Sequence, residues 1–529
     1  MRSCLRWFLL LSAVVGGSRA TVSSAAGQAL RQVIDAEVQA AWQREKLTPA
    51  PRADDAAFLR RIYLDLLGTI PTYEETKAFL ADGDAAKRGK LIDRLLDDPR
   101  FALHQRDVWD LVLFGRNPAG YDATRRRPGF KKWLAEQFAR NVPFDRWARE
   151  VLLGREEGTE LYHVQFRSQP EEATVAVSRI FLGTQLQCAR CHDHPYESWT
   201  QHDFYGMAAF FVRLVVLDPS GKKPHRIAEK STGEVLFSGS AKDQKPGRKG
   251  EPIKAKFLSG KLLDEPPVPK DFKEPKQKLD KIVPPLFSRK EKLAEWVTSR
   301  DNPFFARAVA NRVWAQFLGR GLVHPVDDLS SRNQPSHPAL LKALTDHVLA
   351  EKFDLKKLIR ELVNSETYQL ASTGANTEAL PRWFERARVR PLSAEELLAA
   401  LPVAAGQPAS FKHGGDTIEY FTRYFGEPHD GQGNFQGSLF EHLFMNNADN
   451  IRRMLSASKG NLADTLIRMK EPAAEKVDRL FLSVLSRPPS AAERERFVQH
   501  LSSDAKMTPA LIDEAIWALV SCAEFRFNH

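Results

Sequence analysis

Apolar residues recur at helical spacing in one stretch after another along this chain. Between residues 58 and 67 they occupy positions 58, 59, 62, 63, 66 and 67, and Gly68 follows where such a helix would end. Residues 171–186 carry a second amphipathic pattern, which predicts a helix that leads directly into Cys188 and is ended by Pro195. The sequence therefore predicts a mainly α, multi-helical protein.

Capping signals support this expectation. The pattern Ser/Thr-x-x-Glu, which bonds the first free N–H groups of a helix, occurs at Thr72–Glu75, Ser393–Glu396 and Ser490–Glu493. The segment before Thr72 also matches the segment before Ser490, because a proline precedes each capping residue and apolar positions agree upstream. Two interpretations stay open here: a duplicated helical module at both ends of the chain, or convergence on a common helical hairpin.

The composition changes after Arg213. Residues 214–217, 235–237 and 255–258 read as short strands, and runs rich in Lys, Gly and Pro separate them. A second run of helical patterns begins at Lys290. We therefore expect two domains with a small β insertion between them, in this order: an N-terminal helical domain over 25–213, the β insertion and a Lys/Pro-rich linker over 214–289, and a C-terminal helical domain over 290–529.

The N-terminus has the form of a signal peptide. Arg2 and Arg6 flank the start of an apolar run that ends at Val15, and small residues at Ser18 and Ala20 suit cleavage after residue 20. The run is too short to anchor the chain across a bilayer. We expect an exported protein, periplasmic or extracellular, that is not transmembrane once residues 1–20 are removed.

The formal net charge of +10 permits attraction to anionic partners. Much of the charge lies in the Lys/Pro-rich stretch, where a solvated basic surface is the simpler interpretation. Export argues against nucleic acid as a partner. Cell-surface polymers remain a possible partner class, as do redox proteins for the reason that follows.

Cys188-x-x-Cys191-His192 is the pattern of c-type haem attachment. Two thiols on one turn can each form a thioether to the haem, and His192 can then bind the iron as an axial ligand. His202 and Met207 are candidates for the opposite axial position. His194 is too close to His192 in sequence to reach the opposite face.

Other chemistry suits the same residues. The two cysteines can form a short disulfide, remain free thiols, or bind zinc or iron together with His192, His194 or His202. A catalytic zinc would need an open position and a base, for which Asp193 and Glu197 are near in sequence. Removal of the signal peptide leaves three cysteines, too few for a disulfide framework.

A third hypothesis is a non-enzymatic scaffold that binds polymers or proteins at the cell surface. The chain carries no nucleophile elbow, phosphate-binding loop or metalloprotease helix motif. Asp327 and Asp328 with His337 form a candidate acid–base group, although carboxylates are common in loops of this kind.

The chain resembles a large family of secreted proteins abundant in planctomycetes. Its members pair two domains of unknown function and are often fused to a planctomycete-type cytochrome c module. The resemblance rests on segments spread over most of the chain: Phe58 to Pro71, Cys188 to Pro195, Asp203 to Phe211, Asn311 to Trp314, Gly319 to Val323, Pro325 to Asp328, Pro335 to Pro338 and Glu524 to His529.

The resemblance implies that the Cys188–His192 motif is characteristic of the family, while it implies no established activity. This chain has no separate cytochrome module, which argues against a multi-haem carrier. Many members carry a cysteine pair near residues 426–436, where Gly431 to Asn434 stand here, so a metal role for that loop is not expected. The expectation is an exported haem-c-binding redox or electron-transfer protein, with a metal-site protein or hydrolase and a scaffold as alternatives.

Overall fold

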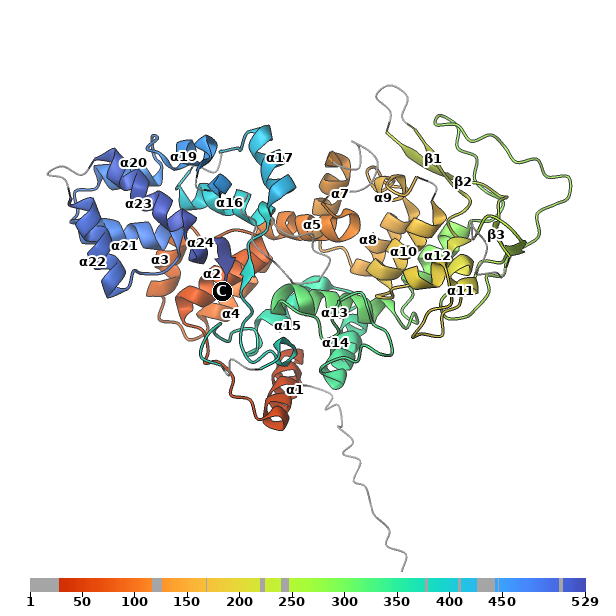
Figure 1. The fold of residues 1–529 in the computed structure, drawn as a ribbon, viewed down its shortest axis with the longest axis horizontal. Coiled ribbons are helices and arrows are strands. Elements are labelled where there is room, and N and C mark those ends of the chain that lie inside the picture. The colour runs from red at the N-terminus through yellow and green to blue at the C-terminus, as the bar shows by residue number, and fades with distance from the viewer. Residues whose placement is uncertain are drawn as a thin grey trace, which may run out of the picture.

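The computed structural model confirms a mainly α fold with a few short strands (Figure 1). It describes residues 28–116, 126–167, 169–218, 224–238, 247–375, 379–407, 411–425, 443–445, 447–503 and 508–529. The expected signal peptide and the glycine-rich loop at residues 431–434 lie outside this part of the chain.

The N-terminal half is a succession of helices. They are α1 (Leu30–Glu45), α2 (Asp55–Leu67), α3 (Tyr73–Ala81), α4 (Lys87–Leu96), α5 (Pro99–Phe114), α7 (Pro128–Ala139), α8 (Phe144–Leu153), α9 (Leu161–Val164), α10 (Pro170–Phe181), the 3-10 helix η1 (Gln187–Arg190) and α11 (Gln201–Ala208). Proline at the first position of α5, α7 and α10 supplies the fixed backbone angle that a helix start requires.

The β insertion consists of two hairpin-like pairs. Strand β1 (Leu214–Leu217) pairs antiparallel with β2 (Arg226–Glu229), and β3 (Val235–Phe237) pairs antiparallel with β4 (Glu251–Ile253). The prediction of strands at 214–217 and 235–237 is confirmed. The strand predicted at 255–258 is wrong, because there Lys256 N–H donates to Gly206 and Phe257 N–H to Lys261 instead of to a neighbouring strand.

The C-terminal half is again helical. It contains α12 (Arg289–Val297), α13 (Phe305–Leu318), α14 (Pro338–Ala350), α15 (Leu355–Val363), the 3-10 helix η2 (Pro381–Trp383), α16 (Ala394–Ala404), α17 (Gly415–Tyr424), α19 (Asp449–Leu455), α20 (Leu462–Arg468), α21 (Ala473–Val484), α22 (Ala491–Leu501), α23 (Pro509–Ser521) and α24 (Ala523–Arg526). A short antiparallel pair joins β5 (Arg390–Pro391) to β6 (Phe527–Asn528).

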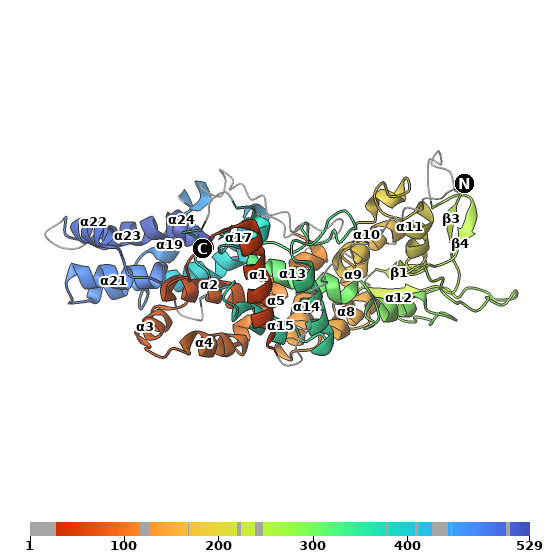
Figure 2. The ribbon, with the colours of Figure 1, turned by 90° about the horizontal axis from the view of Figure 1, so that it is seen from below.

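Two hydrophobic cores hold these helices together. The larger core runs from Leu30 to Phe384, so it contains buried residues from both halves of the chain. The smaller core gathers α16 and α19–α24, and α2 adds Leu64 to it. Figure 1 shows these C-terminal helices beside α2 and α3 at one end of an elongated molecule, and the β insertion at the other end; Figure 2 shows the same order from below.

Helix α2 therefore faces two cores, and a buried arginine fixes it to the second. Arg60 is 1% exposed. Its guanidinium donates to the main-chain oxygens of Val484 at 3.3 Å and Phe525 at 2.8 Å. Carbonyl acceptors of this kind satisfy a buried donor, and they attach the end of the chain to α2.

The predicted capping boxes form as expected. Thr72 and Glu75 cap α3, Ser393 and Glu396 cap α16, and Ser490 and Glu493 cap α22. The two matching segments thus share a helix, a capping box and a second helix, and α3 lies against α21. This arrangement is compatible with duplication and with convergence.

One predicted helix end is wrong. The helix expected over 171–186 ends at Phe181. Gly183 explains the earlier end, because its φ of +61° turns the chain out of the helix and is a backbone angle that favours glycine. Across the described residues, no helix is both long and apolar enough to cross a membrane.

Candidate functional site

The cysteine motif lies on a short 3-10 turn. After Gly183 the chain forms η1, and Cys191 N–H donates to the Cys188 carbonyl at 3.4 Å to close the turn. A cysteine pair on one turn presents both thiols to the same side of the backbone. Both cysteines are exposed and neither is in a disulfide, so a ligand has free access to both thiols.

His192 follows the turn and is also exposed. Its Nδ1 lies 2.7 Å from the main-chain oxygen of Asp193. A carbonyl only accepts hydrogen bonds, so Nδ1 carries the proton and Nε2 keeps its lone pair. Histidines that bind metals usually have this second hydrogen bond, which fixes the ring and its tautomer.

His194 has the opposite arrangement. Its Nδ1 accepts hydrogen bonds from the main-chain N–H groups of Tyr196 at 3.3 Å and Glu197 at 3.1 Å. Because Nδ1 is the acceptor, the proton of the neutral ring sits on Nε2. In this conformation His194 closes its own loop and offers no lone pair to a metal.

The two carboxylates near the motif also have structural partners. Asp193 accepts from the N–H of Gln201 at 2.9 Å, at the start of α11. Thr200 and Asp203 form a capping box there that was not predicted. Glu197 is bound by the other half of the chain, as described below. Neither carboxylate is an unoccupied general base in this structure.

The two other predicted ligands lie in different surroundings. His202 is exposed on α11, with its ring edge-on to Phe237 at 5.2 Å. Met207 is fully buried in the larger core. The structure thus places His202 on the surface with the cysteines and keeps Met207 inside. No group of three or more His, Cys, Asp or Glu side chains able to hold a metal ion occurs among the residues described.

Tyr205 holds the turn by a hydrogen bond, a role that the sequence did not predict. Its hydroxyl donates to the main-chain oxygen of Arg190 at 3.0 Å, and its ring packs against Phe237. Burial raises the pKa of Tyr205 to about 12, so the hydroxyl stays protonated as a donor. Its position inside an aromatic helix gave no sign of this role.

A loop at 326–332 in the C-terminal half contacts the segments before and after the motif. Asp327 accepts from Gln185 at 3.2 Å and pairs with Arg179 at 3.4 Å. Leu329 N–H donates to the Gly183 carbonyl at 2.8 Å. The segment before the cysteines is therefore fixed by residues more than a hundred positions away.

The same loop holds the segment after the motif. Ser331 donates to Glu197, and the guanidinium of Arg332 lies 4.0 Å from the centroid of the Tyr196 ring. Tyr196 is 58% exposed, so the arginine covers one part of a surface aromatic ring. A cation over an aromatic face is a favourable contact.

Asp327 and His337, suggested as an acid–base group, have separate partners in the structure. Asp327 bonds the first half of the chain, whereas His337 is buried against Trp383 and Phe384. Burial lowers the pKa of His337 to about 4. The imidazole is thus a neutral core group at physiological pH.

Comparison with known families finds matches to two separate regions of the chain. Residues 33–215 match PSCyt2, described as "Protein of unknown function (DUF1549)", and residues 289–455 match PSD1, described as "Protein of unknown function (DUF1553)". Neither the curated proteins nor the solved structures contain a match. The cysteine motif lies in the first matched region and the 326–332 loop in the second.

Proposed function

We propose that this chain, which pairs a domain of the PSCyt2 family with a domain of the PSD1 family, is an exported redox protein that carries haem c. Cys188 and Cys191 would attach the haem and His192 would be the proximal ligand. Each thiol would add its sulfur and hydrogen across one vinyl double bond, so the attachment itself requires no external oxidant.

The observation that carries this proposal is the tautomer of His192. The Nδ1–H of the neutral ring donates to the Asp193 carbonyl at 2.7 Å, and Nε2 is left with the lone pair that an iron ligand needs. The thiols of Cys188 and Cys191, four residues and one residue before His192, are exposed and in no disulfide. These three residues fit a c-type attachment site without rearrangement of a buried group.

The bound haem would supply a one-electron iron couple, whose potential depends on the axial ligands and on solvent exposure. The chain contributes position and surroundings. Tyr205 and Gln201 bind the carbonyl of Arg190 and hold the turn. His202 is exposed and would be available as a second ligand, whereas Met207 is fully buried in the core.

The alternative is a zinc or iron site that uses the two cysteines with His192, His194 or His202. Of these three, His194 is the least available, because its Nδ1 already accepts two main-chain hydrogen bonds. Its Nε2 would have to lose a proton before it could bind a metal. His194 is therefore a loop-closing residue in our proposal, and redox proteins are the expected partners of the exposed motif.

A matched pair of histidine variants tests the proposal. The mature chain would be produced in cells that attach haem c, as wild type, His192→Ala and His194→Ala. We expect a Soret band in the wild type, a shifted or lost band in His192→Ala, and a band of unchanged position in His194→Ala. A colourless wild-type protein with bound zinc and a band-free spectrum would contradict haem attachment and favour the metal site.

A further inference from the structure

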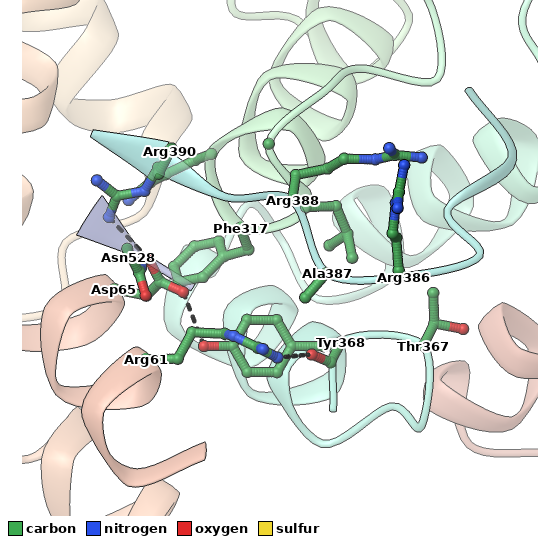
Figure 3. Close-up of a pocket in the computed structure, with 13 residues that line it drawn as sticks. Arg61, Asp65, Phe317, Thr367, Tyr368, Arg386, Ala387, Arg388, Arg390 and Asn528 are labelled. Atoms are coloured by element: carbon green, nitrogen blue, oxygen red, sulfur yellow. Dashed lines mark hydrogen bonds and ion pairs between the residues drawn. The ribbon is translucent and has the colours of Figure 1, made fainter. Parts of the chain in front are cut away.

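A second site candidate lies far from the cysteine motif, at the junction of the two halves of the chain. Figure 3 shows a small cavity between α2, the end of α13, the segment at 386–390 and the last strand. Its volume is about 20 Å³. A cavity of this size has room for one small polar group and not for a complete cofactor.

On one wall of the cavity the charged side chains are bound to each other and to polar neighbours. The carboxylate of Asp65 accepts from the Tyr368 hydroxyl at 2.8 Å, from Arg390 at 2.9 Å and from the Asn528 amide at 2.8 Å. Arg390 also binds Glu396 at 2.7 Å. On this side Asp65 and Glu396 share the guanidinium of Arg390, so this wall has no excess of positive charge and no need of an anion.

The opposite wall has an excess of positive charge. Arg386 and Arg388 both bind the carboxylate of Glu385, at 3.3 Å and 2.7 Å. Glu385 is fully buried, so the two guanidiniums share one negative charge. The buried Nε of Arg388 has no hydrogen-bond partner. Burial, together with repulsion from Arg386 and Arg320, lowers the pKa of Arg388.

Arg61 adds a third guanidinium from α2. It is 5% exposed and donates to the main-chain oxygens of Tyr368 at 2.9 Å and Leu370 at 2.8 Å, with a longer contact of 3.4 Å to His529. Its Nη2 is buried without a partner. Within the described part of the chain, no Asp or Glu side chain forms an ion pair with it.

We propose that this cavity binds one oxoanion group, a carboxylate, sulfate or phosphate, through Arg61, Arg386 and Arg388. Guanidinium groups match the oxygens of such anions with paired hydrogen bonds. Arg386 and Arg388 share the single carboxylate of Glu385, and a bound anion would balance the remaining positive charge. The site is independent of haem, because none of its residues touches the cysteine motif.

Titration calorimetry of the purified full chain tests the site. Sodium sulfate, phosphate and acetate would be titrated separately, with chloride at the same ionic strength as the reference. The variants are Arg386→Gln and Arg388→Gln. Arg468→Gln is the matched control, because Arg468 is 70% exposed and pairs with Asp464 on a distant helix.

We expect saturable one-to-one binding for at least one oxoanion, and the three separate titrations identify whether it is the planar or the tetrahedral class. Both pocket variants should bind about tenfold or more weakly, while the control keeps the wild-type affinity. Absence of saturable binding by all three oxoanions would overturn the proposal. Equal affinity in the pocket variants, or an equal response to chloride, would overturn it as well.

Arg388→Gln removes one of the two guanidiniums that bind the buried Glu385, and this loss can unfold the variant. Arg386 makes the longer contact to Glu385, so Arg386→Gln decides the question in that event. Circular dichroism of each variant identifies the folded ones before titration.

Discussion

Ser331 donates two hydrogen bonds to the same oxygen of Glu197, from its main-chain N–H at 2.5 Å and from its hydroxyl at 2.7 Å. Glu197 lies five residues after His192, and Ser331 lies in the region that matches the second family. The two family domains are thus joined at the candidate redox site itself. A change in the position of one domain would therefore displace Glu197 and the loop that follows the motif.

A double-mutant cycle measures this link. We expect Glu197→Ala and Ser331→Ala to show a coupling free energy of about 1 kcal/mol, because a hydrogen bond to a charged acceptor is stronger than a neutral one but this pair is exposed to water. The measurement is urea unfolding of both single variants and the double variant. Strictly additive effects would mean that the hydroxyl contact contributes nothing in solution, since the alanine variant keeps the main-chain N–H of residue 331.

The turn at Gly183 should be intolerant of a side chain. An added Cβ would lie 2.6 Å from Leu329 Cδ1, and the φ of +61° strains any other residue. Gly260 is a matched control, because it has a φ of +87° with no atom within 4 Å of the added Cβ. Both alanine variants pay about 1 kcal/mol for the backbone angle.

We expect Gly183→Ala to lose at least about 1 kcal/mol more than Gly260→Ala, since overpacking adds to its backbone strain. Chemical denaturation provides both values. Equal losses would show that the loop at 326–332 can move away from Gly183 without cost.

His337 should make the protein less stable in mild acid. Burial lowers its pKa from the usual 6.5 to about 4, so between these values the unfolded chain binds more protons than the folded chain. Stability is therefore lost as pH falls below about 6.5. From pH 7 to pH 5 the loss from this residue is about 2 kcal/mol.

His337→Phe keeps an aromatic ring between Trp383 and Phe384 and removes the titrating group. Unfolding free energies at pH 7 and pH 5 should differ less in this variant than in the wild type. His163, which burial also shifts to a pKa of about 3, keeps part of the slope in both proteins. An unchanged slope in the variant would contradict the burial of a neutral His337.

Replacement of the buried Asp65 should destabilise the protein more than replacement of an exposed carboxylate. Asp65→Ala would take the acceptor from the Tyr368 hydroxyl and the Asn528 amide, and Arg390 would keep only Glu396 as a carboxylate partner; loss of one partner from a buried ionic network costs about 3–5 kcal/mol. Asp93→Ala is the control, because its pair with Arg360 is about half exposed and should contribute less than about 1 kcal/mol. Thermal unfolding of the two variants compares them directly, and similar losses would contradict a buried network at Asp65.

Features set by a few neighbouring residues could be predicted from the sequence. The capping boxes at Thr72, Ser393 and Ser490 and the helix end at Gly68 form as expected, because each depends on contacts within one turn. The first and third strands were also found. Their partners were not: β2 has no clear alternation, and the pairing of β3 with β4 spans a Lys/Gly-rich stretch.

The residues around the candidate site could be predicted only in part. The cysteines and His192 follow from their spacing. The tautomer of His194 depends on where two main-chain N–H groups point, and the contact of Glu197 with Ser331 joins positions 134 residues apart. The arginine cavity combines α2 with residues beyond 316, and no local pattern indicates it.

The central claim is covalent haem on Cys188 and Cys191. The most direct measurement is the intact mass of the mature protein after denaturation, produced in cells with haem-c attachment machinery. We predict the mass of the chain plus one haem for the wild type, and the unmodified chain mass when both cysteines are replaced by serine. A wild-type chain that leaves denaturation with its unmodified mass would contradict the claim.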